Sequence, residues 1–296
     1  MPPTVWWIMQ NILLIDGKNT AYRALFAARG NREFRESGYH PFVVWLRFTH
    51  VWLEEFKPDS VHVFWDCPKD HVWRKRVFKE YKDQRETMMH YDNDVQADMH
   101  NIIDSASDIL PYMGVRQYLR EGQESDDLIY SACRAMAPGK SDTRKVIVVS
   151  SDSDFLQLAW YMQHVVVYEP KHRKFVELSD IDPAMQKALT GDRADNIDGY
   201  RGIGPVKSRQ LLLEMSKLFE FLNAAGVDKK KFRRNLALID LSLNPSCLSN
   251  LVYVMRVMAE EVKFDKASAT KMAMKHKVNG FLAEYPSLAV PFKRLT

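Results

Sequence analysis

The stretch KVIVVSSDSDF, residues 145–155, joins an apolar run to a pair of aspartates. The run Val146–Val149 has the length and the β-branched content of a buried strand. In an open parallel sheet, ligands bind beyond the carboxyl ends of the strands, where Asp152 and Asp154 would lie. A second interpretation stays open at this point, because Asp and Ser also favour the start of a helix.

Strand signals alternate with helical signals through much of the chain. Apolar segments typical of strands occupy residues 11–16, 60–66, 115–119, 145–150 and 164–169, and helical patterns lie between them. This alternation predicts an α/β fold whose mostly parallel central sheet carries helices on both faces. After about residue 180 the strand signals stop, and the pattern is helical apart from a glycine-rich turn over 199–204.

These patterns divide the chain into two parts. We expect an α/β core over residues 9–180 and a helical region over residues 181–296. Residues 1–8 lie ahead of MQNILLIDG, which looks like a natural start, so we expect them to be an extension with little structural role.

Composition sets broad limits on the class of protein. With 296 residues, 46% of them hydrophobic, the chain is long enough to bury a sizeable core. The formal net charge of +4 hints at an acidic partner. Three scattered cysteines predict a reducing compartment without a disulfide framework. No apolar run approaches the roughly 20 residues that span a bilayer, and the start lacks the basic segment of a signal peptide. We therefore expect a cytoplasmic location and no membrane partner.

Acidic residues follow each of the first four predicted strands, and two more lie just past the sheet in TGDRADN, residues 190–196. The set is Asp16, Asp66, Glu124, Asp126, Asp127, Asp152, Asp154, Asp192 and Asp195. Any one of them could serve a turn or complement a helix dipole. Those separate roles do not explain why four strands deliver carboxylates to the same edge.

Carboxylates that converge in this way repel one another strongly unless cations lie among them. Oxygen ligands alone select hard ions such as Mg²⁺ or Mn²⁺. Histidine and cysteine are not clustered with these acids, which argues against zinc. Two ions roughly 4 Å apart suit phosphodiester hydrolysis, in which one activates a water and the other stabilises the leaving oxygen.

A basic stretch, DHVWRKRVFKEYKDQR, occupies residues 70–85 and interleaves its cations with Trp73, Phe78 and Tyr81. Such a run is often a solvated helix face. Beside a carboxylate site, a second interpretation gains weight, because Lys and Arg pair with phosphate and aromatic rings stack on unpaired bases.

The glycine-rich stretch DNIDGYRGIGPVKS, residues 195–208, does not have the spacing of a dinucleotide fingerprint, and no strand precedes it. A glycine-rich hairpin that enters a helix fits it better. Gly202 and Gly204 would let backbone N–H groups approach a phosphate at the helix N-terminus, and Lys207 would add positive charge. A simple turn between two helices is the alternative.

Six of these segments occur in the order seen in the 5′-nuclease family. They are LLIDGKN, FWD, EYKDQR, EGQESDD, SSDSDF and GDRADNIDGYRGIG. The chain resembles phage flap endonucleases and the 5′-nuclease domain of bacterial DNA polymerase I over roughly residues 11–240. The resemblance implies a structure-specific, Mg²⁺-dependent nuclease that cuts 5′ flaps near their junction with duplex DNA and degrades 5′ ends. It also implies a helical arch over about 67–93 and a helix–hairpin–helix over about 188–215.

The resemblance assigns roles residue by residue. All nine acids named above match metal-binding acids of the family. Lys82 and Arg85 match residues at the base of the arch that contact the scissile phosphate, and Tyr81 matches an aromatic residue that stacks near the cut site. Arg74 matches a further basic residue, and the turn containing Gly202, Gly204 and Lys207 matches the segment that grips duplex phosphates. A K⁺ ion held there by backbone carbonyls is a further implication, and an RNA–DNA hybrid is a second candidate substrate.

Two departures and two rival functions accompany the resemblance. Val206 stands where the family often has a basic residue, and the residues beyond about 240 match nothing that we can place. A phosphatase with a strand-end nucleophile would need Asp-x-Asp at the first strand, where this chain has Asp16, Gly17 and Lys18. A non-catalytic DNA-junction binder on the same fold would be expected to lack some of the acids, and none is missing.

Overall fold

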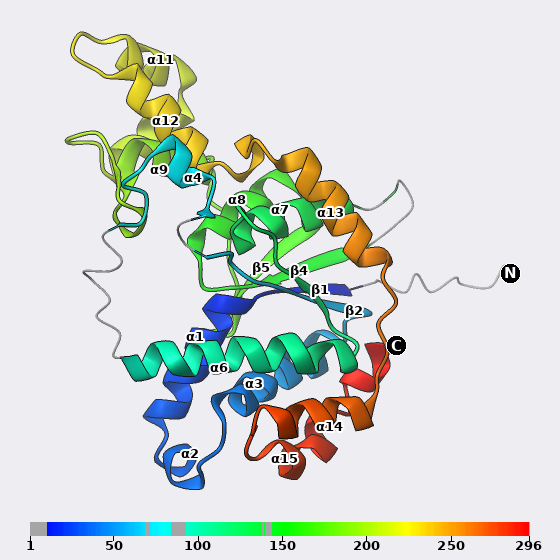
Figure 1. Cartoon of the computed structure of the whole chain (residues 1–296). Helices are drawn as coiled ribbons and strands as arrows, with labels where there is room; N and C mark the ends of the chain where they lie inside the picture. Colours follow the sequence, from blue (N-terminus) through cyan, green and yellow to red (C-terminus); the bar gives the residue numbers. More distant parts are fainter. Residues whose placement is uncertain (1–10, 69–70, 84–92, 138, 140–143, 296) are drawn as a thin grey trace, which may run out of the picture.

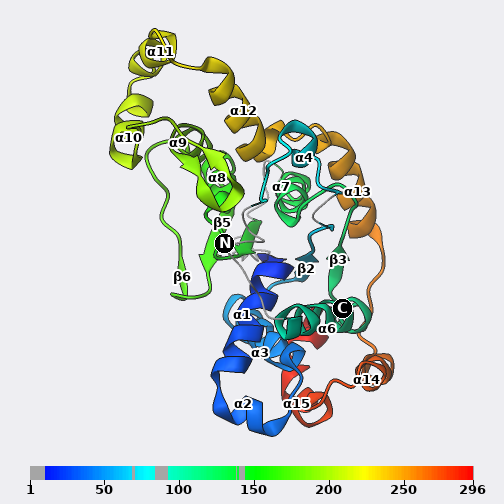
Figure 2. The ribbon, with the colours of Figure 1, turned by 60° about the vertical axis from the view of Figure 1, so that its left-hand side comes forward.

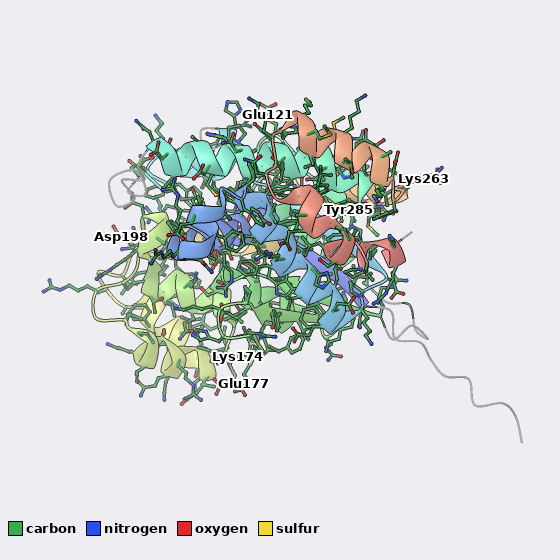
Figure 3. The ribbon with its side chains drawn as sticks, turned by 90° about the horizontal axis from the view of Figure 1, so that it is seen from below. Glu121, Lys174, Glu177, Asp198, Lys263 and Tyr285 are labelled. Carbon is green, nitrogen blue, oxygen red and sulfur yellow. The ribbon has the colours of Figure 1, made fainter. Side chains whose placement is uncertain are left out.

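The computed structural model describes residues 11–68, 71–83, 93–137, 139 and 144–295. Its central sheet has the strand order β3-β2-β1-β4-β5-β6. The strands are β1 (Asn11–Asp16), β2 (Ser60–Phe64), β3 (Arg116–Tyr118), β4 (Lys145–Val149), β5 (Val165–Glu169) and β6 (Lys174–Phe175). All neighbouring strands run parallel except β5 and β6, which confirms the predicted mostly parallel sheet. Glu121, just past β3, and Lys174, in β6, lie on opposite sides of the molecule (Figure 3).

Helices cover both faces of the sheet, as predicted (Figure 1). On one face lie α1 (Gly17–Gly30), α2 (Arg32–Ser37), α3 (Pro41–Phe56) and α6 (Asn93–Ile109), and on the other lie α7 (Ser125–Ala135), α8 (Leu156–Tyr161) and α13 (Cys247–Ala259). The central strand β1 shows why two layers form. Leu13 and Ile15 join one hydrophobic core, whereas Ile12 and Leu14 join the other, as the two-residue period of a strand requires.

The C-terminal residues, which the sequence patterns left unplaced, pack against α3 and α6. They form α14 (Lys266–Lys275) and α15 (Phe281–Leu288), and Phe281 and Phe292 are fully buried in the same core as α3. An ion pair of 2.7 Å between Arg47 and Glu284 joins α3 to α15. Figure 3 shows Tyr285 on α15, on this side of the fold.

The predicted all-helical region after residue 180 contains a short pair of strands as well. Its helices are α9 (Pro183–Thr190), α10 (Pro205–Leu213), α11 (Met215–Asn223) and α12 (Lys229–Ile239). Between α9 and α10, β7 (Gly191–Asp192) pairs antiparallel with β8 (Ile197–Asp198), so the expectation that strands stop was wrong here. Two-residue strands are too short to show a period, so no pattern in the sequence predicted them. Whether this segment acts as a helix–hairpin–helix remains a prediction.

The predicted arch is only partly described. Its described residues contain one short helix, α4 (Arg74–Val77), followed by turns through residue 83. Residues 69–70 and 84–92 lie outside the described part, so the arch over 67–93 stays a prediction. In the described parts of the chain, no helix is long and apolar enough to cross a membrane.

Gly17, at the junction of β1 and α1, provides a test of this fold. A β-carbon added there would lie 2.6 Å from the Trp65 ring and 2.8 Å from the Phe64 carbonyl oxygen. We expect Gly17→Ala to lower the free energy of unfolding by about 2 kcal/mol through overpacking.

Gly30→Ala, at the other end of the same helix, is the matched control. Nothing lies within 4 Å of its added β-carbon, so it should leave stability unchanged or raise it by about 0.5 kcal/mol. Urea unfolding measures both variants, and equal stabilities would contradict the close contact at Gly17.

Candidate metal centre and active site

The ends of β1, β2 and β4 place three carboxylates at one edge of the sheet. Asp16 ends β1 and caps α1, accepting hydrogen bonds from the Asn19 N–H (3.2 Å) and the Ser150 hydroxyl (2.9 Å). Asp66 follows β2 and accepts from the Ser125 N–H at 2.8 Å. Asp152 follows β4 and raises the pKa of Asp16 by its charge. The predicted convergence of strand-end acids is therefore present in the structure.

A first acid group lies at the N-terminus of α7. Oxygens of Glu124, Asp126 and Asp127 come within 4.8 Å of one another, close enough to hold a metal ion together. A capping box fixes them, because the Glu124 side chain accepts from a backbone N–H of the first turn while Asp127 accepts from the Glu124 N–H. The positive end of the helix dipole favours negative charge at this position.

Arg74 contacts this first group from the protein interior. Its guanidinium donates to Glu124 at 2.7 Å, to both carboxylate oxygens of Asp127 at 3.0 Å, and to the Leu238 carbonyl at 2.9 Å. The side chain is only 1% exposed. This burial does not fit the DNA contact expected of Arg74, because its charge faces the acids and not solvent.

Asp127 is the most enclosed of the three acids, with a side chain that is 0% exposed against 7% for Glu124 and 19% for Asp126. Besides Arg74, it accepts hydrogen bonds from the Trp73 indole N–H (3.0 Å) and the Glu124 N–H (3.1 Å), and its side chain is fully buried. Its carboxylate thus faces protein donors on both oxygens. We propose that Asp127 holds Arg74 and the first turn of α7 in place, while Glu124 and Asp126 offer the oxygens to a metal.

A second acid group lies at the two 3₁₀ turns that follow β4 and β7. Asp154, in the 3₁₀ turn Ser153–Phe155, meets Asp192 and Asp195 within 4.8 Å. Lys187 of α9 bridges the group, at 2.5 Å from Asp154 and 2.8 Å from Asp192. A cavity of about 540 Å³ opens here, lined on one side by Asn19 and residues 151–154 and on the other by Lys187 and residues 190–195.

Tyr81 and Lys82 join the two acid groups. The Tyr81 hydroxyl lies 3.1 Å from Glu124 and 3.0 Å from Asp195, and the Lys82 ammonium lies 2.5 Å from Glu124 and 3.7 Å from Asp195. Lys82 has a φ of 60°, in the left-handed region that residues other than glycine seldom adopt. Tyr81 is 1% exposed, so its ring does not present a stacking surface to a base in this arrangement.

Burial and mutual repulsion perturb the pKa values of these acids. Burial, helped by the charges of Asp66 and Asp152, raises the pKa of Asp16 to about 7. Burial and Asp152 likewise raise the pKa of Asp154 to about 6. Burial opposes ionisation of Asp66 too, but Lys18 and Lys82 outweigh it and lower its pKa to about 2. Burial and repulsion thus disfavour the charged forms of Asp16 and Asp154, whereas Lys18 and Lys82 favour the charged form of Asp66.

The donor set fits a hard divalent ion. All nine predicted acids supply carboxylate oxygens, and the cations in contact with them in the described residues are Lys18, Arg74, Lys82 and Lys187. Nine carboxylates thus face four cations, and burial together with neighbouring charge raises the pKa values of Asp16 and Asp154. Divalent cations among these oxygens would relieve the same repulsion.

The residues predicted to bind duplex DNA lie apart from the acids, at the start of α10. Gly204 is the N-cap residue, without a side-chain cap, and Lys207 is exposed in the first turn. Gly202 has a φ of 76°, which a glycine adopts without strain. Arg85, predicted as a catalytic residue, lies outside the described residues.

Sequence reasoning missed two cations of the site. Lys18 pairs with Asp66 at 3.1 Å, and Lys187 bridges Asp154 and Asp192. Lys18 follows Asp16 in the quoted IDGKN motif, which was a usable signal. Lys187 stands alone in an amphipathic helix, five residues before Asp192, and nothing in the sequence pointed from α9 to the end of β4.

A protein-family model matches the part of the chain that forms the central sheet. The model of the 5′-3′ exonuclease N-terminal, resolvase-like domain matches residues 11–188, more than half of the chain. The chain belongs to this family. Its match begins at β1 and ends in α9, so it includes the ends of the strands that carry the acids.

Curated relatives agree with this family. The chain is 30% identical over 220 residues to a 5′-3′ exonuclease of Mycoplasma pneumoniae, covering 69% of this chain and 72% of that protein. It is also 30% identical to DNA polymerase I of Caldicellulosiruptor bescii over 76% of this chain. The chain spans only about a quarter of the length of such polymerase relatives.

Solved structures share the fold. The T5 D15 protein co-crystallised with metal ions superposes with a TM-score of 0.65, covering 90% of this chain and 98% of that one at 19% identity. A T5 D15 flap endonuclease in a pseudo-enzyme–product complex with DNA and metal ions gives a TM-score of 0.64 at 20% identity, with 90% and 100% coverage. At these identities the likeness establishes the architecture.

Asp127 and Asp126 form a matched pair for testing the proposed division of roles. We expect Asp127→Asn to lower the free energy of unfolding of the metal-free protein by about 3 kcal/mol, because Arg74 loses a buried partner. Asp126→Asn should change it by less than about 1 kcal/mol, because its 3.5 Å contact with Arg74 is offset by repulsion from Glu124 and Asp127.

Urea unfolding and Mn²⁺ titration calorimetry without DNA check the pair. Mn²⁺ affinity should fall for Asp126→Asn. If the two variants unfold at the same urea concentration, Asp127 is not the buried support proposed above.

Proposed function

We propose that this protein is a structure-specific 5′ nuclease, a flap endonuclease and 5′-3′ exonuclease of DNA replication or repair. The observation that carries the proposal is the meeting of carboxylates from the ends of β1, β2 and β4 with those of α7 and the β7–β8 segment. The family match supports it. The substrates would be DNA flaps and 5′ ends, with an RNA–DNA hybrid as a second candidate, in the cytoplasm of a bacterial or phage-infected cell.

Glu124 and Asp126 would hold one ion, and Asp154, Asp192 and Asp195 a second, with Asp16, Asp66 and Asp152 between them. All are oxygen donors, which favours Mg²⁺ or Mn²⁺. Divalent charge there would lower the pKa of an attacking water and stabilise the leaving oxygen. The protein's own task is to bring the scissile phosphate to this edge and to neutralise it.

Lys82 is placed for that task, and Arg85 is proposed to share it. The Lys82 ammonium lies between the two acid groups, so a phosphate bound across them would lie beside it. A fixed positive charge at this point stabilises the negative charge that develops on the phosphate oxygens in the transition state. Tyr81, hydrogen-bonded to acids of both groups, would fix the backbone from which Lys82 extends.

The start of α10 is proposed to grip duplex phosphates. Gly204 leaves the first N–H groups of the helix open to an anion, and an added β-carbon there would meet nothing within 4 Å in the free protein. Lys207 would supply a cation, and a K⁺ ion held by backbone carbonyls of the turn is part of the proposal. Val206, which is 75% exposed, takes the position where a basic residue was expected.

The central test is cleavage of a labelled 5′-flap duplex with and without Mg²⁺. We expect Mg²⁺-dependent release of the flap, and a loss of at least a thousandfold in rate for Asp152→Asn, because one removed carboxylate disables the charge stabilisation on which the reaction depends. Binding of the flap in Ca²⁺ should remain.

Asp104→Asn, an exposed acid of α6, is the control and should cleave like the parent. Flap binding without cleavage by the parent would instead favour a non-catalytic junction binder. Release of phosphate from a monoester substrate alone would favour the phosphatase.

Gly204→Val tests the grip on duplex DNA. A branched side chain would hold a phosphate away from the helix N-terminus, so we expect weaker binding to flap and plain duplex and unchanged binding to single strands. Lys207→Ala should be milder and should lower the salt dependence of binding by about one counterion.

Fluorescence anisotropy in Ca²⁺, at several salt concentrations, measures these affinities. If Gly204→Val binds duplex as the parent does, the segment is only a turn between α9 and α10.

A further inference from the structure

A basic turn lies beside the metal centre and has no role so far. Residues 170–173 join β5 to β6, and the sequence over 171–174 is Lys-His-Arg-Lys. All four side chains are exposed. Because β5 runs parallel to β4, the carboxyl end of β5 and this turn lie at the same edge of the sheet as Asp152.

Glu169 fastens the turn to the segment that carries Asp152. Its carboxylate accepts hydrogen bonds from the Ser151 hydroxyl at 2.9 Å and from the N–H groups of Lys171 and His172 at 2.8 Å each. The His172 ring nitrogen Nδ1 lies 2.5 Å from it as well. Both oxygens of the turn's own acid are therefore occupied, which leaves the outer side of the turn positive.

A second attachment comes from α1. The Arg23 guanidinium donates to the Pro170 carbonyl at 2.9 Å. Arg23 lies one helical turn beyond Asn19, which lines the cavity of the second acid group. The turn is thus held on two sides by elements that also form the cavity, so its position relative to the metal centre is defined.

Arg173 adopts a left-handed backbone, with a φ of 52°. Glycine or asparagine would occupy this conformation at lower cost. The Arg173 side chain hydrogen-bonds the Tyr168 side chain, which holds it at this edge of the sheet, and it remains exposed to solvent.

The turn and α10 lie on the same flank of the molecule, with α8 and α9 between them (Figure 2). Across this flank the order is α10, α9, the cavity, Ser151 and then the basic turn. The basic turn therefore lies on the other side of the cavity from α10.

We propose that Lys171 and Arg173 form a second phosphate-binding subsite, which contacts the duplex arm on the far side of the cut from α10. The inference rests on the proposed function and adds to it a contact that would set how a two-armed flap substrate lies across the metal centre. The contact is to phosphates, so it fixes the position of the DNA and is insensitive to its sequence.

The test variant is Lys171→Ala with Arg173→Asn, since asparagine tolerates the left-handed backbone. Lys277→Asn is the matched control, because Lys277 is also exposed, also has a φ of 52°, and follows α14 on the C-terminal side of the fold. Binding is measured by anisotropy in Ca²⁺ over a range of salt, with a flap carrying both duplex arms and with a flap lacking the far arm.

For the two-armed flap, we expect the double variant to bind about tenfold more weakly and its log–log salt slope to shrink by about 1.8, the value for two phosphate contacts. On the substrate without the far arm it should match the parent, and the control should match the parent on both. The single-turnover cleavage rate at saturating protein should be unchanged, because neither residue contacts the acids.

Equal binding of the two-armed flap by parent and double variant would overturn the subsite. An equal loss on both substrates would overturn its assignment to the far arm. Failure of the proposed function shows separately, as a parent that does not cleave the flap in Mg²⁺.

Discussion

The repulsion between buried carboxylates is the constraint on which the rest of this structure depends. Parallel strands end at one edge, so any acid that follows a strand arrives beside the others. Here the acids are drawn from β1, β2, β4, α7 and the β7–β8 segment. Each must be matched by a hydrogen-bond donor or a cation, and the donors come from segments far apart in the sequence. The interactions that neutralise the acids of the site therefore also hold distant segments of the fold together.

The cations of the site link elements that are far apart in the sequence. Arg74 ties α4 to the start of α7, and its Nε–H reaches the Leu238 carbonyl at the end of α12. Lys187 ties α9 to the turn after β4. Lys82 spans both acid groups. The helical region after residue 180 is thus attached to the sheet partly through charges of the site itself, while the C-terminal helices stabilise the opposite face through the hydrophobic core.

The sequence predicted the sheet, its helical layers and the gathering of acids at one edge, because each rests on a short, periodic or strand-terminal pattern. It could not predict β7 and β8, which are too short to show a period. It also assigned Arg74 and Tyr81 to DNA, because a basic and aromatic run looks the same whether it faces a phosphate or a buried carboxylate. Only the partner of the basic residue distinguishes the two cases. For Arg74 that partner is Asp127, which lies 53 residues away in the chain. The pairing of Lys187 with acids of the site could not be predicted for the same reason.

The choice between arginine and lysine divides the site into a permanent and an adjustable part. Arg74 uses its planar fork on both oxygens of Asp127, also donates to Glu124, and is fully enclosed, so its charge stays with these two acids. Lys18, Lys82 and Lys187 carry compact charges on flexible stems and keep 42%, 14% and 25% of their side chains exposed. Such ammonium groups can turn toward another anion at small cost, because solvent already reaches them. Lys82 joins the two acid groups and Lys187 pairs with two acids that line the cavity, whereas Asp127, held by Arg74 on both oxygens, faces protein. The architecture thus places its fixed charge where support is needed and its movable charges where a phosphate has to be received.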